Sequence, residues 1–288
     1  MILALDIGAT NIKVALFDTK NLPKIAEQAV VPTNAVKGFD AICDSVKKAI
    51  GLFADKASAV AIASAGDVDS DKGVITYATG NLPGMTGFDY PKFVWQNFRL
   101  HATALNDAHA AILGEVRYGV GDVGKRIAML TLGSGVGGGY CVDGKICATK
   151  QNDFARFGHI CLHPNGRFCN CGKSGCVESY LSGRALHKDA AQQGVDGADL
   201  FEKFLQCSAK HVSFVQNFCK TFQLALDKIN NVAPFDVCIV GGGVVDWIGD
   251  GFDDVFGKMN KKVVRAALGN LAGVYGALAY MFDKGVVL

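Results

Sequence analysis

Residues 2–17 read ILALDIGATNIKVALF, and this stretch decides the fold. Two apolar runs, Ile2–Leu5 and Ile12–Phe17, have the composition of β-strands, and Gly8 between them permits a tight turn. The stretch therefore predicts a β-hairpin. Asp6 stands at the end of the first strand, where a carboxylate needs a reason to be present, because charged side chains seldom close an apolar strand.

Glycine turns follow two later apolar strands as well. Residues 127–132 lead into Gly133–Gly139, and residues 237–240 lead into Gly241–Gly243. Glycines after a strand let backbone N–H groups approach a phosphate closely, so the set of three turns predicts a nucleotide site. Each turn taken alone is equally compatible with an ordinary tight turn. The GxxxxGK[ST] pattern does not occur, which argues against a P-loop kinase.

The chain is expected to alternate strands with helices. Apolar residues recur at helical spacing over residues 38–54, a buried strand is expected at 59–63, and a second helical segment covers 212–229. This order favours α/β layers with ligands at the carboxyl ends of the strands. Aligning residues 6–10 with 131–135 further suggests a duplicated architecture of two similar lobes.

Asp6, Thr10 and Lys13 are candidates for the phosphate end of the nucleotide. A carboxylate suits the water shell of Mg²⁺, while the hydroxyl and the ammonium suit phosphate oxygens. The alternative is a turn-capping aspartate beside a solvated lysine. Asn106-Asp107 stands at an expected strand-to-helix junction. An N-cap explains this pair, and so does a catalytic carboxylate that accepts the proton of an attacking hydroxyl.

His159 is followed by three cysteines in the segment Cys169-Asn170-Cys171-Gly172-Lys173-Ser174-Gly175-Cys176. One imidazole and three thiolates complete a tetrahedral Zn²⁺ site with no open position, so its expected role is structural. We interpret His163 as a surface loop residue and not as a fifth ligand. The other cysteines are expected to be small buried hydrophobic residues: Cys43, Cys141, Cys147, Cys161, Cys207, Cys219 and Cys238.

Composition restricts the class of protein. The 288 residues carry a formal net charge of +2 and no long basic run, which argues against nucleic-acid binding. No apolar stretch is long enough for a membrane helix, and the N-terminus lacks the features of a signal peptide. We therefore expect a cytoplasmic protein without a membrane partner, whose thiols are reduced.

These motifs together resemble the ROK family of bacterial sugar kinases and sugar-responsive repressors. The resemblance runs from residues 6–10 through 106–108, 132–139, 158–178 and 241–243 to 268–277. It implies an α/β actin-like ATPase/hexokinase fold with two lobes, each a mixed β-sheet flanked by helices, and a cleft between them. It also implies a homodimer that uses ATP, Mg²⁺ and a structural Zn²⁺ to phosphorylate a hexose or N-acylhexosamine, commonly at the 6-hydroxyl, as a glucokinase or N-acetylmannosamine kinase does.

Site residues follow from the resemblance position by position. Asp107 matches the catalytic base. The expected sugar contacts are Gly66, Thr79, Asn81, Asn106, Asp107, Arg156, His159 and Glu178, with Ala65 and Leu82 in the same wall. The expected nucleotide contacts are Asp6, Gly8, Thr10, Lys13, Gly133, Ser134, Gly135 and Gly242, and the expected zinc ligands are His159, Cys169, Cys171 and Cys176.

Arg156 departs from the family pattern, which has Glu two residues before the Gly-His pair. A hydrogen-bond acceptor is thereby replaced with a five-donor cation, so the sugar pocket must differ. We hypothesise that Arg156 pairs with Asp153 or meets a carbonyl or anionic group of the substrate. The departure keeps one alternative open, a catalytically degenerate sugar sensor, although a sensor has no need of Asp107.

Two other functions fit the sequence less well. A repressor of the family needs a helix-turn-helix module ahead of the first phosphate turn, which begins here at Asp6. An acetate-kinase-like or ATP-hydrolysing protein has no reason for a zinc motif beside a sugar loop. We expect the first lobe to comprise residues 1–107 and 268–288, and the second to comprise residues 108–267 with the zinc segment at 159–178.

Overall fold

The computed structural model describes residues 1–20, 23–121, 123–147, 153–192, 194 and 209–286. The chain forms two compact units, which are described separately. The first comprises Met1–Gly121 and Asn270–Leu288, and the second Asp122–Thr149 and Asp153–Gly269. The sequence prediction ends the first lobe at residue 107, whereas the unit continues through helix α3 (Asp107–Tyr118).

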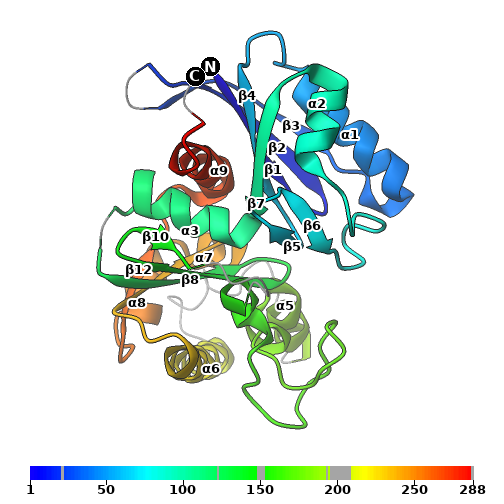
Figure 1. Cartoon of the computed structure of the whole chain (residues 1–288). Coiled ribbons are helices and arrows are strands. Elements are labelled where there is room, and N and C mark those ends of the chain that lie inside the picture. Colours follow the sequence, from blue (N-terminus) through cyan, green and yellow to red (C-terminus); the bar gives the residue numbers. More distant parts are fainter. Residues whose placement is uncertain (21–22, 122, 148–152, 193, 195–208, 287–288) are drawn as a thin grey trace. The chain divides into compact units, whose positions relative to one another are not determined.

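A five-stranded sheet forms the centre of the first unit, in the order β3-β2-β1-β4-β7 (Figure 1). The predicted hairpin is confirmed, since β1 pairs antiparallel with β2. β3 also runs antiparallel to β2, whereas β4 and β7 run parallel to β1. The strands are β1 (Ile2–Ile7), β2 (Asn11–Asp18), β3 (Lys24–Pro32), β4 (Ala59–Ser64) and β7 (His101–Asn106).

Helices cover both faces of this sheet and give the unit two cores. On one face α1 (Phe39–Gly51) and α2 (Tyr90–Phe98) pack on the strands, and on the other α3 packs there with α9 (Ala272–Asp283) (Figure 1). A small hairpin of β5 (Asp67–Asp69) and β6 (Val74–Tyr77) follows β4, and a short 3₁₀ turn covers Ala35–Lys37.

Two glycines explain why α3 belongs to the first unit. A Cβ on Gly276 of α9 would overlap the Ala110 carbonyl oxygen of α3, and a Cβ on Gly114 of α3 would overlap the Ala272 carbonyl oxygen of α9. The two backbones therefore touch directly, which only residues without a side chain allow. The sequence prediction missed this packing because it involves residues more than 150 positions apart in the chain.

The second unit repeats the same sheet arrangement, in the order β10-β9-β8-β11-β12. β8 pairs antiparallel with β9 and parallel with β11, and β12 continues parallel beyond β11. The duplication predicted from the glycine turns is thus matched strand by strand, with β8 in the place of β1. The strands are β8 (Arg126–Leu132), β9 (Val136–Val142), β10 (Lys145–Ile146), β11 (Val237–Gly241) and β12 (Lys262–Arg265).

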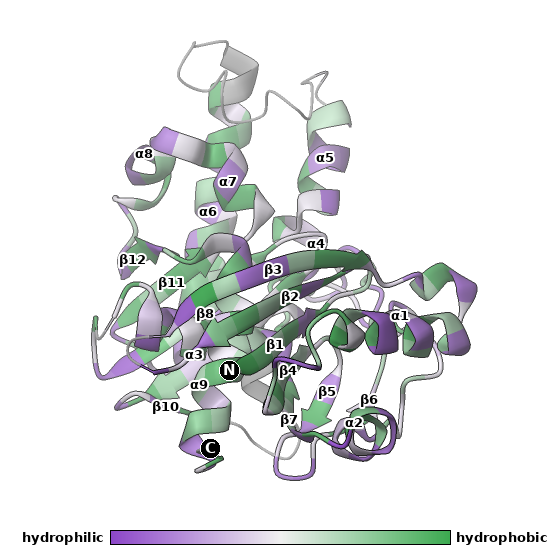
Figure 2. Ribbon diagram, turned by 90° about the horizontal axis from the view of Figure 1, so that it is seen from above, coloured by the Kyte–Doolittle hydropathy of each residue, from purple (hydrophilic) through white to green (hydrophobic). Residues whose placement is uncertain are grey.

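A separate apolar core fills the second unit, built largely from phenylalanines such as Phe157, Phe218 and Phe222. In Figure 2 the inner strands of both sheets are mainly hydrophobic. β3, which is at a sheet edge, carries hydrophobic and hydrophilic residues along its length. The helices and 3₁₀ segments are η2 (Asp153–His159), α4 (Glu178–Leu181), α5 (Gly183–Gln192), α6 (Ala209–Val232), α7 (Gly243–Ile248), η5 (Gly249–Gly251), α8 (Phe252–Phe256) and η6 (Gly269–Leu271). No helix within the described part of the chain is long and apolar enough to cross a membrane.

Candidate active site and metal centre

Asp107 is the first residue of α3, directly after the carboxyl end of β7. Because β1, β4 and β7 are parallel, this end of the sheet also carries Asp6 and Ser64. Burial and the neighbouring charge of Asp6 raise the pKa of Asp107 to about 6, although hydrogen bonds from backbone N–H groups and the charge of Lys13 oppose this rise. A carboxylate with such a pKa can accept a proton near neutral pH.

Asn106 holds the catalytic candidate in place. Its Oδ1 accepts hydrogen bonds from the N–H groups of Ala108 and His109 at 3.0 and 3.1 Å, which confirms the N-cap interpretation. Its Nδ2 donates to the Gly66 carbonyl oxygen at 2.8 Å and to Asp107 Oδ1 at 3.0 Å. The side chain is 7% exposed, and all its usual hydrogen bonds are satisfied. A direct bond to a sugar hydroxyl would have to replace one of these four.

A buried hydrogen-bonded pair lies behind the Ala65–Gly66 turn. Ser64 Oγ lies 2.8 Å from the hydroxyl of Tyr90 and donates to the Ala65 carbonyl oxygen at 3.0 Å. Gly66 has a φ of +98°, and a Cβ there would lie 2.8 Å from the Tyr77 carbonyl oxygen. The turn is therefore fixed from one side by the Ser64–Tyr90 pair and from the other by Asn106.

Thr79 and Asn81, the predicted opposite wall, are exposed in the loop after β6, where Thr79 Oγ1 accepts from the Asn81 N–H at 3.3 Å. Leu82 is only 2% exposed and packs in the core. The resemblance to the family placed Leu82 in the same wall; its side chain points into the apolar interior, so a sugar contact of Leu82 stays a prediction.

Asp6 pairs with Lys13 across the hairpin, with 2.9 Å between Oδ2 and Nζ. The turn itself is closed by the Gly8 N–H, which donates to the Asn11 carbonyl oxygen at 3.0 Å, and Thr10 is exposed. A Cβ on Gly273, in the first turn of α9, would lie 2.7 Å from the Asp6 carboxyl carbon. This glycine therefore lets the helix approach the carboxylate.

The glycine turn of the second unit, Gly133–Gly135, joins β8 to β9 and is supported from the segment that follows the cysteines. The Val136 N–H donates to Glu178 Oε2 at 2.9 Å, and the Gly183 N–H donates to the Gly133 carbonyl oxygen at 2.7 Å. Gly242 follows β11 with a φ of +95°, and a Cβ there would lie 2.6 Å from the Leu132 carbonyl oxygen. Two of the predicted nucleotide turns thus lie side by side.

His159, Cys169, Cys171 and Cys176 come together as the sequence predicts, with their ligand atoms all within 4.8 Å of one another. Cys171 Sγ lies 3.7 Å from Cys176 Sγ, and Cys169 Sγ lies 3.7 Å from His159 Nδ1. A tetrahedral zinc ion with bonds of about 2.3 Å to sulfur holds its thiolates roughly 3.8 Å apart, so the residues fit zinc. Burial and the neighbouring thiols raise the pKa of Cys176 to about 12. A bound cation would offset the free-energy cost of ionising this thiol.

Two glycines shape the loop around these ligands. Gly172 and Gly175 have φ values of +85° and +81°, and a Cβ on Gly175 would overlap the His163 carbonyl oxygen. Glu178 lies directly beyond the loop, with Oε1 4.0 Å from Cys169 Sγ. Its carboxylate therefore lies between the cysteine cluster and the glycine turn. The sequence analysis predicted a sugar contact for Glu178 but not these two contacts.

Arg156 lies in η2 and is exposed. The residues after it are tightly packed on β9, since Phe157 is buried against Gly138 and a Cβ on Gly158 would overlap the Val136 carbonyl oxygen. This packing fixes the backbone of His159. The proposed partner Asp153 has a side chain outside the described residues, so the pairing with Arg156 stays a prediction.

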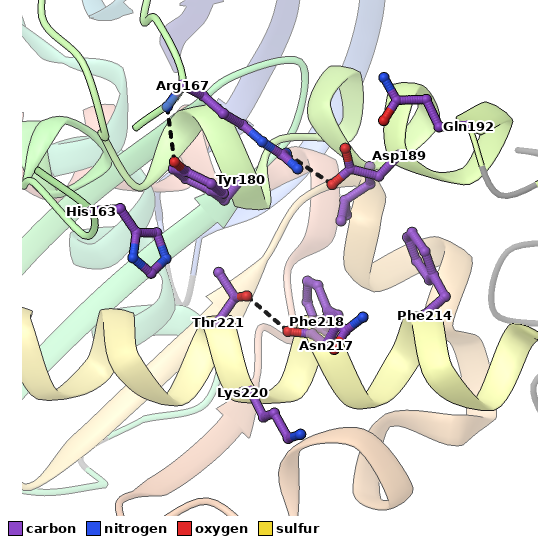
Figure 3. A pocket seen from close by; sticks show the side chains of 11 residues that line it. His163, Arg167, Tyr180, Asp189, Gln192, Phe214, Asn217, Phe218, Lys220 and Thr221 are labelled. Carbon is purple, nitrogen blue, oxygen red and sulfur yellow. Dashed lines mark hydrogen bonds and ion pairs between the residues drawn. The ribbon is translucent and has the colours of Figure 1, made fainter. Parts of the chain in front are cut away.

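A separate pocket of about 350 Å³ is lined by residues of α4, α5 and α6 together with His163 and Arg167 (Figure 3). His163 lines it and contacts the Tyr180 ring edge-on at 5.0 Å, so it stands apart from the predicted zinc ligands, in an exposed loop as predicted.

Cys141 and Cys238 are fully buried as predicted, but for Cys161 the prediction is wrong, because its side chain is exposed in the loop. Cys207 lies outside the described residues.

Sequence reasoning missed three residues at these sites. Ser64 and Tyr90 belong to β4 and α2, and Arg184 belongs to α5, where its Nε donates to the Ser134 carbonyl oxygen at 2.8 Å. A serine directly before the Ala65–Gly66 turn was the only available signal for the first pair. Arg184 had none, because its partner lies 50 positions earlier in the chain.

Comparison with known proteins finds similarity over nearly the whole chain. A sequence model described as the ROK family matches residues 2–284. The N-acetylmannosamine kinase of Salmonella newport (strain SL254) is 31% identical over 245 residues, which are 84% of this chain and 82% of the relative.

Solved structures show the same fold. A ROK family glucokinase from Streptomyces griseus, in complex with glucose and AMPPNP, is 28% identical with a TM-score of 0.80, and the match covers 96% of this chain and 97% of that one. A ROK hexokinase from Thermus thermophilus is 26% identical with a TM-score of 0.77 and 99% coverage of both chains. The predicted fold class is confirmed.

Proposed function

Because the chain belongs to the ROK family, we propose that it transfers the γ-phosphate of ATP to a hydroxyl of a hexose or N-acylhexosamine, most readily the 6-hydroxyl. The observation that carries this proposal is Asp107, a carboxylate with a pKa of about 6 at the carboxyl end of a parallel strand, close to the charge of Asp6. A sugar-binding protein without turnover has no use for such a base.

In the proposed reaction the sugar oxygen attacks the γ-phosphorus, the bond to the bridging oxygen of ADP breaks, and the hydroxyl proton passes to Asp107. Asn106 orients Asp107 through the 3.0 Å bond from its amide. Asp6 would hold the water shell of Mg²⁺, which neutralises phosphate charge when it is bound. The remaining sugar contacts in this proposal are Gly66, Thr79, Asn81, Arg156, His159 and Glu178.

The nucleotide would lie on the glycine turns, with contacts to Gly8, Thr10, Lys13, Gly133, Ser134, Gly135 and Gly242. Zinc would be held by His159, Cys169, Cys171 and Cys176 as a structural ion, since four protein ligands leave no open position. The homodimer and the cytoplasmic location that the sequence analysis expects stay predictions.

N-acylhexosamines are the preferred substrate class in this proposal. The curated relative described above is an N-acetylmannosamine kinase, and Arg156 brings hydrogen-bond donors to a place where the family has an acceptor. An N-acyl carbonyl oxygen is a stronger hydrogen-bond acceptor for a guanidinium than the hydroxyl groups of glucose, which accept and donate. The second candidate function, a sugar sensor without turnover, rests on the same arginine.

A coupled assay of ADP formation separates these functions. The purified chain is given ATP, Mg²⁺ and one sugar at a time from a panel of N-acetylmannosamine, N-acetylglucosamine, glucose, mannose, allose, fructose and a β-glucoside. We expect the highest kcat/KM with an N-acetylated hexosamine. Sugar binding in calorimetry without sugar-stimulated ADP formation from any member of the panel would instead establish the sensor.

A further inference from the structure

Arg184 lies in the first turn of α5, next to the glycine turn that joins β8 to β9. Its Nε donates to the Ser134 carbonyl oxygen at 2.8 Å, and both side chains are exposed. Within the described residues, no carboxylate or carbonyl oxygen accepts a hydrogen bond from its two terminal nitrogens. The guanidinium therefore lies beside the turn, and the N–H groups of its terminal nitrogens can donate to a ligand.

Hydrogen bonds of the neighbouring residues fix the backbone at Arg184. The preceding Gly183 N–H donates to the Gly133 carbonyl oxygen at 2.7 Å, and Ser182, which is 3% exposed, accepts from the Ala185 N–H. α5 is thus attached to the turn through its backbone as well as through the arginine side chain. The Cα of residue 184 is placed by contacts that do not involve its own guanidinium.

The other end of α5 is attached to the cysteine loop. Arg167 Nη1 donates to Asp189 Oδ2 at 2.9 Å and to the Ser179 carbonyl oxygen at 3.2 Å, and its guanidinium lies 4.6 Å from the centre of the Tyr180 ring (Figure 3). α5 therefore cannot turn about its axis without breaking this ion pair. Helix and turn act as one rigid support for the side chain of Arg184.

We propose that Arg184 is a nucleotide-binding residue, which fixes the turn through Nε and binds phosphate oxygens of ATP through its terminal N–H groups. This inference rests on the proposed kinase function. A polyphosphate needs cationic donors, and Lys13, the cation predicted from the sequence, already pairs with Asp6 at 2.9 Å. Arg184 supplies a second positive charge at the glycine turn of the other unit.

Arginine suits this double task better than lysine. The planar guanidinium presents five N–H donors in a fixed fork, so it can bond a carbonyl oxygen on one edge and a phosphate on another. A lysine at the same place would keep the charge but would lose the fixed geometry. The two contributions can therefore be separated by substitution.

Calorimetric titration of the full chain with AMPPNP and Mg²⁺ tests the inference. We expect Arg184→Ala to weaken AMPPNP binding roughly ten- to hundredfold, the range for hydrogen bonds to a charged group, and to reduce the salt dependence of the affinity. Arg184→Lys should lie between this variant and the wild type. The sugar KM should change less than twofold, because the hydrogen bond of Arg184 goes to Ser134 of the predicted nucleotide turn.

Lys188→Ala provides the matched control, since Lys188 lies one turn further along α5 and is also exposed. We expect it to bind AMPPNP like the wild type. Wild-type affinity in Arg184→Ala, or an equal loss in Lys188→Ala, would overturn the inference. So would Arg184→Lys binding no better than Arg184→Ala, since Arg184 would then only shape the turn. If the inference fails in one of these ways but the wild type still phosphorylates sugar, the kinase proposal is unaffected.

Discussion

Asp107 is the residue whose surroundings most directly determine the proposed chemistry. Burial favours its neutral form, and the nearby carboxylate of Asp6 acts in the same direction. The N–H of Ala108, which donates to Oδ1 at 2.8 Å, favours the ionised form. The resulting pKa of about 6 leaves the group mostly ionised at pH 7 and still basic enough to take a proton.

The pH dependence of turnover should report this balance. A base must be ionised to act, so we expect kcat/KM for the best sugar to be nearly constant above pH 7 and to fall about tenfold per unit below pH 6. Asp107→Asn should abolish turnover at every pH and leave sugar binding largely unchanged. A profile that stays flat down to pH 5, or an active Asp107→Asn variant, would contradict the assignment.

At the scale of elements, the direct contact between α3 and α9 depends on glycine. Ala at Gly276 would have to push the Ala110 backbone away, so we expect Gly276→Ala to lower the free energy of unfolding by roughly 1–3 kcal/mol in a urea titration. The direction of the change in the free energy of unfolding is informative, because Gly→Ala inside a helix is otherwise stabilising.

Gly51→Ala is the control for this prediction. Gly51 ends α1, and a Cβ there would meet its nearest neighbour at an ordinary 3.9 Å. We expect this variant to be as stable as the wild type or slightly more so. Equal effects of the two substitutions would mean that α3 and α9 separate at little cost.

Sequence reasoning located the elements that local pattern determines. The hairpin after Ile2, the glycine turn after Leu132 and the cluster of His159 with three cysteines all depend on residues close together in the chain, and each appears where it was predicted. Contacts across the chain were missed. The association of α3 with α9 and the bond from Arg184 to Ser134 depend on tertiary packing, which leaves no periodic signal.

At the scale of the molecule, each unit has cores of its own, and the cysteine cluster belongs to the second. We expect removal of zinc with a chelator to increase hydrogen exchange in residues 160–181, measured by mass spectrometry. β1 and β4 of the first unit should keep their protection, because none of the four ligands lies there.

Variants of two cysteines in the same loop provide the comparison. Cys171→Ser removes a ligand and should reproduce the exchange pattern of the chelated protein together with a loss of bound zinc. Cys161→Ser, which alters an exposed thiol outside the cluster, should retain zinc and full protection. If both variants exchange alike, the cluster does not hold the loop.

The place of α9 in the chain has a consequence for biosynthesis. Val274, Ala277, Leu278 and Met281 complete the core on one face of the first sheet, beside strands β1 and β4. A ribosome delivers these residues only after it has made all of the second unit. The first unit can therefore complete this core only after the second unit has been synthesised, and until then Ala110 and Leu113 of α3 cover that face of its sheet without α9.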